Sequence, residues 1–281
     1  MQMTHRVIAG PRRASKCRKI AGLCSASAIA IGWTAPARAA VIAYSMQQTN
    51  GYALTGGTLG VFNPNTSSSA AQLAVPTGSE AHSGLADALQ SYVGPIAGRP
   101  AENTFTKKGQ TTPDYSRGDS LVNVVTPASN DVAELYLNSL GNSSGSGAWS
   151  ISAPLTLTSG GTVTFGFNYA NELQVINGGD GTAQAKYSYN ISIQDSAGST
   201  VFDSSPNNVN RSLSLPSAGT IDSITSGTIT VTSGNLMVGA YVITVSGNES
   251  VFGSLNQIPE PTTLSLMGLA CAGLLARRRR T

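Results

Sequence analysis

Short runs in which apolar and polar residues alternate fill the middle of the chain, and Gly, Ser, Thr and Asn separate them. The clearest run covers residues 183–194. One face carries only residues that can be buried, namely Ala183, Ala185, Tyr187, Tyr189, Ile191 and Ile193, and the other face is polar. A period of two predicts a β-strand with one buried side and one side in water.

The same period recurs along the chain. Residues 162–169 place Val163, Phe165, Phe167 and Tyr169 on one side, and residues 228–232 and 241–245 repeat the pattern. Weaker strands are predicted at 52–62, 121–126, 132–140 and 149–157. Residues 195–198 (Asp-Ser-Ala-Gly) predict a hairpin turn, with Gly198 in the left-handed conformation.

Two segments are ambiguous or differ from this pattern. Asp131 is suited to cap a helix over 132–140, but alternation favours a strand there, followed by Gly-Ser punctuation at 141–147. Residues 80–92 predict the one short helix, because four residues fall on a single helical face: Leu85, Ala88, Leu89 and Tyr92.

Eight or more half-buried strands between residues 40 and 257 predict an all-β fold. We expect an antiparallel two-layer β-sandwich, jelly-roll-like, with the short helix, and a barrel is the alternative. Residues 40–257 are long enough for one domain with a core of its own.

The first 39 residues predict an export signal. Basic residues come first, an apolar stretch covers 20–33, and Ala37 and Ala39 place small side chains at the two positions that a signal peptidase reads. We expect cleavage after Ala39. Arg12 and Arg13 suggest a twin-arginine signal, but the residues that follow them fit that signal poorly.

The last residues, 258–281, combine three signals. Pro259 and Pro261 fix φ, and Glu260 between them is pushed toward extended geometry. Residues 263–276 are apolar, but a helix of that length spans only about 21 Å, against a hydrocarbon core of about 30 Å. Arg277, Arg278, Arg279 and Arg280 favour the cytoplasmic side of a membrane. The sequence therefore predicts a weak transmembrane helix with Leu264, Leu266, Leu269, Leu274 and Leu275.

This order of motifs resembles the PEP-CTERM sorting signal of Gram-negative bacteria, although it covers only about 24 of the 281 residues. The resemblance implies recognition by exosortase, a membrane-embedded cysteine transpeptidase. The resemblance further implies that exosortase cleaves the tail and passes the protein from the inner membrane to the cell surface or the exopolysaccharide matrix. Pro259, Glu260 and Pro261 would be the recognised substrate. A plain tail anchor is the alternative.

Residues 40–257, which we call the body, differ in charge from the whole chain. Without its two ends the chain keeps six basic and thirteen acidic residues, a net charge of −7. That charge argues against nucleic acid as a partner. The three cysteines, Cys17, Cys24 and Cys271, all lie outside the body, so the body has no disulfide for its stability in an oxidising compartment.

Catalytic signals in the body are sparse. His82 is its only histidine, and no Gly-x-Ser-x-Gly motif accompanies it, so we expect a surface histidine rather than a catalytic triad or a zinc site. A carboxylate pair for glycoside hydrolysis stays open, with five candidates: Glu102, Asp114, Asp119, Glu134 and Glu172. Residues 114–119 are a possible Ca²⁺ loop, and Arg117-Gly118-Asp119 within them reads as a turn.

Trp149 is the one aromatic residue considered for stacking on a sugar, and packing in the core is the favoured alternative. The leading hypothesis is a non-catalytic, secreted surface or matrix protein without cofactor or metal. A carbohydrate-binding module for matrix exopolysaccharide is the second hypothesis, and a glycan-active hydrolase is the third.

Overall fold

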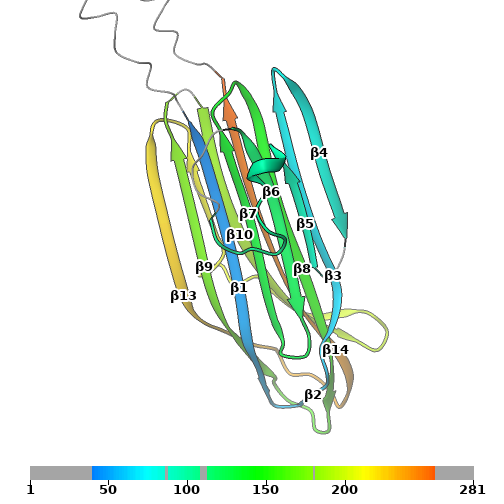
Figure 1. Cartoon of the computed structure of the whole chain (residues 1–281). Coiled ribbons are helices and arrows are strands. Elements are labelled where there is room, and N and C mark those ends of the chain that lie inside the picture. Colours follow the sequence, from blue (N-terminus) through cyan, green and yellow to red (C-terminus); the bar gives the residue numbers. More distant parts are fainter. Residues whose placement is uncertain (1–39, 86–87, 108–112, 180, 257–281) are drawn as a thin grey trace, which may run out of the picture. The chain divides into compact units, whose positions relative to one another are not determined.

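The computed structural model describes residues 40–256, except 86–87, 108–112 and 180. These residues belong to one compact unit made of two antiparallel sheets (Figure 1). The predicted signal peptide and C-terminal transmembrane helix lie outside the described residues. In the part that is described, no helix is long and apolar enough to cross a membrane.

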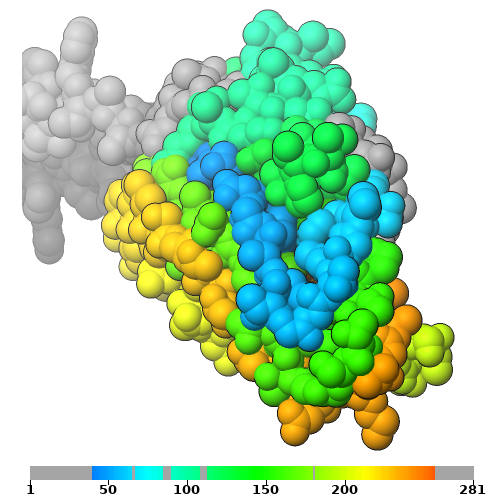
Figure 2. Space-filling view, turned by 90° about the horizontal axis from the view of Figure 1, so that it is seen from below, coloured from blue at the N-terminus to red at the C-terminus, as the bar shows by residue number. Residues whose placement is uncertain are grey.

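The first sheet has six strands. In spatial order they are β13 (Gly219–Thr232), β9 (Thr164–Asn177), β1 (Val41–Thr55), β7 (Ala128–Leu137), β6 (Tyr115–Asn123) and β5 (Ala88–Val93). Figure 2 shows β13 (gold) at the rim of the face in view, with β1 (blue) further inside.

The second sheet has eight strands. Six follow one another as β11 (Thr200–Ser204), β10 (Gly181–Asp195), β14 (Gly239–Leu255), β8 (Gly141–Leu157), β3 (Asn63–Val75) and β4 (Gly78–Leu85). Two shorter strands pair beside them, β12 (Arg211–Leu215) with β10 and β2 (Thr58–Leu59) with β8. The two sheets thus hold more strands than the eight of a jelly roll. The predicted all-β antiparallel two-layer fold is confirmed.

Alternation predicted the inner faces correctly. Along β10, Ala183, Ala185, Tyr187, Tyr189, Ile191 and Ile193 are all buried, while the residues between them are partly or fully exposed. The turn that follows β10 is also confirmed. Gly198 has a φ of +81°, its N–H donates to the Asp195 carbonyl at 3.0 Å, and the Asp195 carboxylate accepts the N–H groups of Ala197 and Ser199.

The predicted helix over 80–92 is wrong. Residues 78–85 form β4, which pairs with β3 in the eight-stranded sheet, and residues 88–93 form β5, which pairs with β6 in the six-stranded sheet. The segment therefore passes from one sheet to the other. Pairing with β3, the strand just before it, and with β6 satisfies its backbone groups, and this outweighs a helical spacing that covers only four residues.

The Gly-Ser stretch at 141–147 is not a loop either. It is the first half of β8, which pairs with β14 on one side and β3 on the other. The strand prediction for 132–140 is confirmed up to Leu137, where β7 ends. Small residues suit β8 because strand β6 of the other sheet comes very close to it.

Near its middle, β6 of one sheet lies almost against β8 of the other. A Cβ atom added to Gly118 would lie 1.9 Å from the Ser146 carbonyl oxygen, and one added to Gly145 would lie 2.2 Å from the Arg117 carbonyl oxygen. Hydroxyl groups bridge the sheets there, with Ser120 Oγ donating to the Ala148 carbonyl at 3.2 Å. Any side chain larger than hydrogen at these glycines would push the sheets apart.

Further along β8, from Trp149 onward, aromatic rings fill the interior. The Trp149 ring meets the Tyr189 ring edge-on at 6.5 Å, and the Phe167 ring meets Tyr189 at 5.7 Å. Tyr52 joins them through contacts with Phe167 and Phe62 at 5.3 and 5.2 Å. These rings belong to one hydrophobic core to which both sheets contribute.

Candidate functional site

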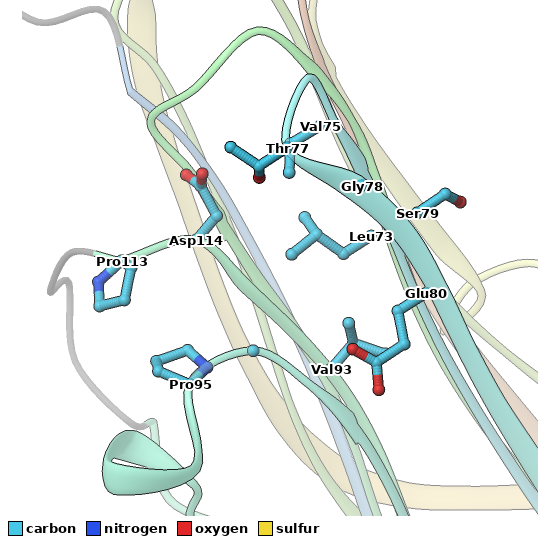
Figure 3. A pocket seen from close by; sticks show the side chains of 11 residues that line it. Leu73, Val75, Thr77, Gly78, Ser79, Glu80, Val93, Pro95, Pro113 and Asp114 are labelled. Carbon is cyan, nitrogen blue, oxygen red and sulfur yellow. The ribbon is translucent and has the colours of Figure 1, made fainter.

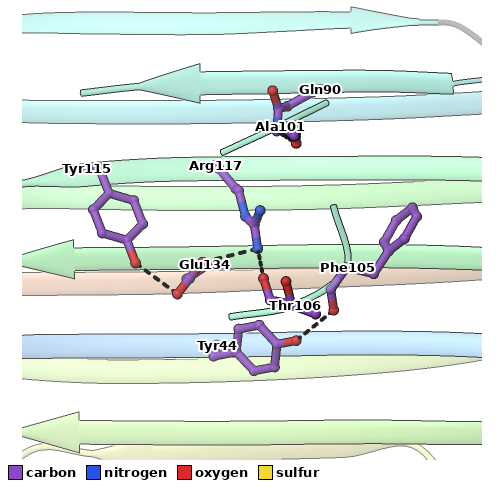
Figure 4. A network of polar contacts seen from close by, with 8 residues as sticks. All are labelled: Tyr44, Gln90, Ala101, Phe105, Thr106, Tyr115, Arg117 and Glu134. Carbon is purple, nitrogen blue, oxygen red and sulfur yellow. Dashed lines mark hydrogen bonds and ion pairs between the residues drawn. The ribbon is translucent and has the colours of Figure 1, made fainter. Parts of the chain in front are cut away.

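A connecting segment, residues 95–107, crosses the outer face of the six-stranded sheet, and we call it the strap. Three side chains of the sheet hold its backbone (Figure 4). Gln90 Nε2 donates to the Ala101 carbonyl at 3.1 Å, Arg117 Nη2 donates to the Thr106 carbonyl at 2.6 Å, and Tyr44 Oη donates to the Phe105 carbonyl at 3.3 Å. The strap thereby buries charged side chains that strands β6 and β7 carry on this face.

The centre of this buried layer is an ion pair. Arg117 on β6 and Glu134 on β7 are opposite each other in the strand register, and Arg117 Nη2 lies 3.2 Å from Glu134 Oε2. Both side chains are almost fully buried, and Tyr115 Oη donates to Glu134 Oε1 at 2.8 Å. Removing one partner of such a pair is costly, because the other charge would stay buried and uncompensated.

Other predicted carboxylates gather around the strap. Glu172 on β9 pairs with Lys107, whose ammonium lies 4.8 Å above the Tyr44 ring. Asp119 on β6 is fully buried. Burial raises its pKa to about 7, although Arg117 opposes the shift. Glu102 lies exposed in the strap and adds to the raised pKa of Asp119.

The fifth candidate, Asp114, stands apart from this layer. Its Oδ1 accepts the backbone N–H groups of Asn138 and Ser139 at 2.5 and 3.1 Å, so it holds the end of β7. Residues 115–119 are part of strand β6, and both Arg117 and Asp119 are buried. The predicted turn at Arg117–Asp119 is therefore wrong, and the possible Ca²⁺ loop is a strand from Tyr115 onward.

Two further carboxyl groups lie between the sheets, and the sequence did not predict them as a pair. Asp131 extends from β7 and Glu249 from β14, and both have no exposed surface. A Cβ atom on Gly147 would lie 3.3 Å from the Asp131 Cγ and 3.2 Å from a Glu249 carboxylate oxygen. Glu249 sits on an otherwise small or apolar face with Val245, Gly247 and Val251, and that break in the pattern was the available signal.

Burial raises the pKa of both groups well above the usual range. For Glu249 the neighbouring Asp131 adds to the increase, and the Ser45 hydroxyl works against it. For Asp131 the Ser120 hydroxyl lowers the pKa but does not outweigh burial. Burial thus favours the protonated, uncharged form of both carboxyl groups, because an unpaired charge there would cost several kcal/mol.

The remaining candidates occupy ordinary positions. His82 on β4 is exposed, and its ring nitrogen lies 2.5 Å from Glu80 Oε1. Trp149 is 1% exposed and belongs to the core, so its ring has no free face for a sugar. Among the residues that the structure describes, no group of three or more His, Cys, Asp and Glu side chains is placed to hold a metal ion.

A cleft of about 440 Å³ opens between the β3–β4 hairpin and the beginnings of β6 and the strap (Figure 3). Leu73, Val75 and Val93 give it apolar walls, and Glu80 and Asp114 supply carboxylates. Both carboxylates already have partners, His82 and the β7 backbone respectively.

The residues predicted for export and sorting all lie outside the described part of the chain. They are Ala37 and Ala39 at the cleavage site, Pro259, Glu260 and Pro261, the leucines of the apolar run, and Arg277 to Arg280.

Comparison with known proteins bears on this C-terminal segment. Residues 257–280 match the model of the PEP-CTERM protein-sorting motif. The chain has no match among curated proteins. The resemblance found in the sequence is thereby confirmed for the tail, which carries a protein-sorting motif.

Proposed function

We propose that this protein, which carries a PEP-CTERM sorting motif at 257–280, is a non-catalytic exported β-sandwich delivered to the cell surface or exopolysaccharide matrix by exosortase. The observation that carries the proposal is the motif match itself. The last described strand, β14, ends at Leu255, directly before the motif. Loss of the tail would therefore leave every described strand intact.

The contacts of the body favour a structural role. Three of the five carboxylates considered for catalysis are engaged, Glu134 by Arg117, Glu172 by Lys107 and Asp114 by backbone N–H groups. They fasten the strap and the strand ends. A carbohydrate-binding module or a glycan-active hydrolase would need a surface other than Trp149 and these groups. Binding to purified matrix polysaccharide, or its turnover, would favour those alternatives.

In this proposal the protein passes through the inner membrane in three steps. Signal peptidase removes residues 1–39. The apolar run and Arg277 to Arg280 then hold the C-terminus at the membrane by the positive-inside rule. The run is too short to anchor strongly, which suits a segment that exosortase removes. The released body has no need of a cofactor or a nucleic acid.

The test replaces Pro259, Glu260 and Pro261 together with alanine. The variant should be exported but keep its full tail in the inner membrane, whereas the wild type should lose Arg277 to Arg280 and reach the surface or matrix. Mass spectrometry of the C-terminus and fractionation measure both results. Thr262→Ala with Thr263→Ala is the matched control in the same tail. A wild-type protein that retains its arginines beside an active exosortase would show that the segment is a plain anchor.

A further inference from the structure

Strand β13 forms one side of the six-stranded sheet, and no described strand pairs with its outer edge. It pairs with β9 along all 14 residues without a shift in register, and it pairs with nothing else among the described residues (Figure 1). An edge strand presents unpaired N–H and C=O groups on the side away from its partner. The other three edges are shorter, at six residues for β5, five for β11 and eight for β4.

The edge of β13 lacks the features with which proteins usually block pairing to another chain. Those features are short length, proline, lysine or a bulge. Its sequence, GTIDSITSGTITVT, contains no proline and no basic residue, and Asp222 is its only charged side chain. Two other edge strands do carry features that hinder such pairing. The edge strand β4 has the polar side chains of Glu80 and His82, and the edge strand β5 is hydrogen-bonded through Gln90 to the strap.

The side chains of β13 are also open to a partner. Ile224 is 74% exposed and Ile221 is 37% exposed, although both are large and apolar. Thr228 and Thr230 next to them are exposed as well. Isoleucine and threonine are residues that stabilise pairing between strands.

We propose that β13 is a self-association edge, at which a second copy of this chain pairs antiparallel through its own β13. A two-fold axis brings a strand antiparallel to itself, so one surface serves both copies. With the axis at Ser226, Ile224 faces Thr228 and Asp222 faces Thr230 of the other copy. The single negative charge of each strand then meets a hydroxyl group rather than its like.

A second copy fits this edge better than an unrelated strand because it matches the edge in length, in lack of charge and in side-chain type. The two six-stranded sheets would join into one continuous sheet across the dimer. This inference is independent of the sorting proposal, since it concerns only the described body. Failure of either one leaves the other standing.

Cysteine cross-linking tests the geometry, because the body has no cysteine of its own. In a background with Cys17, Cys24 and Cys271 changed to alanine, cysteine replaces Ile224, Ser226 or Thr228 in turn. Residues opposite each other in adjacent strands have Cβ atoms about 4.5–5.5 Å apart, so the position nearest the axis should form a disulfide between copies. Ser246→Cys is the control, because β14 is paired on both sides.

Added charge tests the energetics. Replacing Ile224, Ser226 and Thr228 with lysine should weaken dimerisation about tenfold or more, measured by sedimentation of the exported protein. The matched control places three lysines at Thr244, Ser246 and Asn248 on the outer face of β14 and should leave the dimer unchanged. A wild-type protein that stays monomeric and forms no disulfide at any of the three positions overturns the proposal. A dimer that survives the β13 lysines overturns it as well.

Discussion

The aromatic core around Trp149 and Tyr189 and the small-residue contact between β6 and β8 belong to one sandwich but are packed by opposite means. In the first, rings 5–7 Å apart fill the space between the sheets. In the second, glycines let the backbones approach until no Cβ atom fits, as at Gly118 and Gly145. Serine hydroxyls there bond to carbonyl groups of the other sheet.

The difference shows that hydrophobic burial is only one of the ways in which this protein joins its sheets. The aromatic region gains free energy by removing apolar surface from water. The small-residue region has little apolar surface to remove, and it depends on close fit and on hydrogen bonds whose groups are buried. Asp131 and Glu249 lie next to it, so the polar part of the interior also carries ionisable groups.

The largest expected effect is in the aromatic region. Phe165→Asp should unfold the protein, because an unpaired buried carboxylate costs several kcal/mol, against a total stability of about 5–15 kcal/mol. Circular dichroism of the exported protein should lose its strand signal. Phe165→Leu is the control and should stay folded. A folded Asp variant would mean that Phe165, which is 1% exposed, is not part of the packed core.

A smaller loss is expected in the small-residue region. Gly118→Ala should lower the free energy of unfolding by about 3 kcal/mol, because its Cβ atom would meet carbonyl oxygens of Ser146 and Ala70 that belong to fixed backbone. Urea unfolding measures the change. Gly234→Ala is the control, since nothing lies within 4 Å of the added atom. Equal stability of both variants would disprove the close fit of the sheets.

The smallest effect, when it is counted for one carboxyl group and one pH unit, concerns the pH dependence of stability. The pKa values of Asp119, Asp131 and Glu249 are raised in the folded state, so the folded protein binds protons that the unfolded chain has released. Stability should be greatest below the unfolded pKa of about 4 and should fall as pH rises, by about 1.4 kcal/mol per pH unit for each such group. For Asp119 the fall should end at about pH 7.

Glu249→Gln should reduce the fall of the free energy of unfolding with pH by the contribution of one carboxyl group. Asp203→Asn, which changes an exposed residue on β11, should leave that fall unchanged. Urea titrations at pH 4, 6 and 8 provide the measurement. Stability that increases from pH 4 to pH 8 would contradict the inference that the buried groups are protonated.

Much of the fold was predictable because a strand records its two faces locally. The alternation along 183–194 and 162–169 identified the buried residues, including Phe165 and Tyr189. The turn at Asp195–Gly198 was predictable because a left-handed φ favours glycine. The sorting motif was predictable because its signals lie within 24 consecutive residues.

Other features depend on which distant strands meet. Residues 88–92 and the Gly-Ser half of β8 were misassigned because their partners lie far away in the sequence, β6 for the former and β3 and β14 for the latter. Residues 80–85 pair with the strand just before them, and a helical spacing was read there in place of that hairpin. Nothing local in the sequence places Asp131 opposite Glu249, or Arg117 beneath the strap.

The sequence by itself determined the strand periodicity, the acidic body without cysteine and the sorting tail, since each follows from neighbouring residues. Only the tertiary structure decided the pairing order, the contact at Gly118 and Gly145, the buried carboxyl pair and the position of β13 at the edge of the described sheet. The physical reason is that burial, pKa and exposure of an edge are properties of the space between segments, and loop closure rather than local preference brings those segments together.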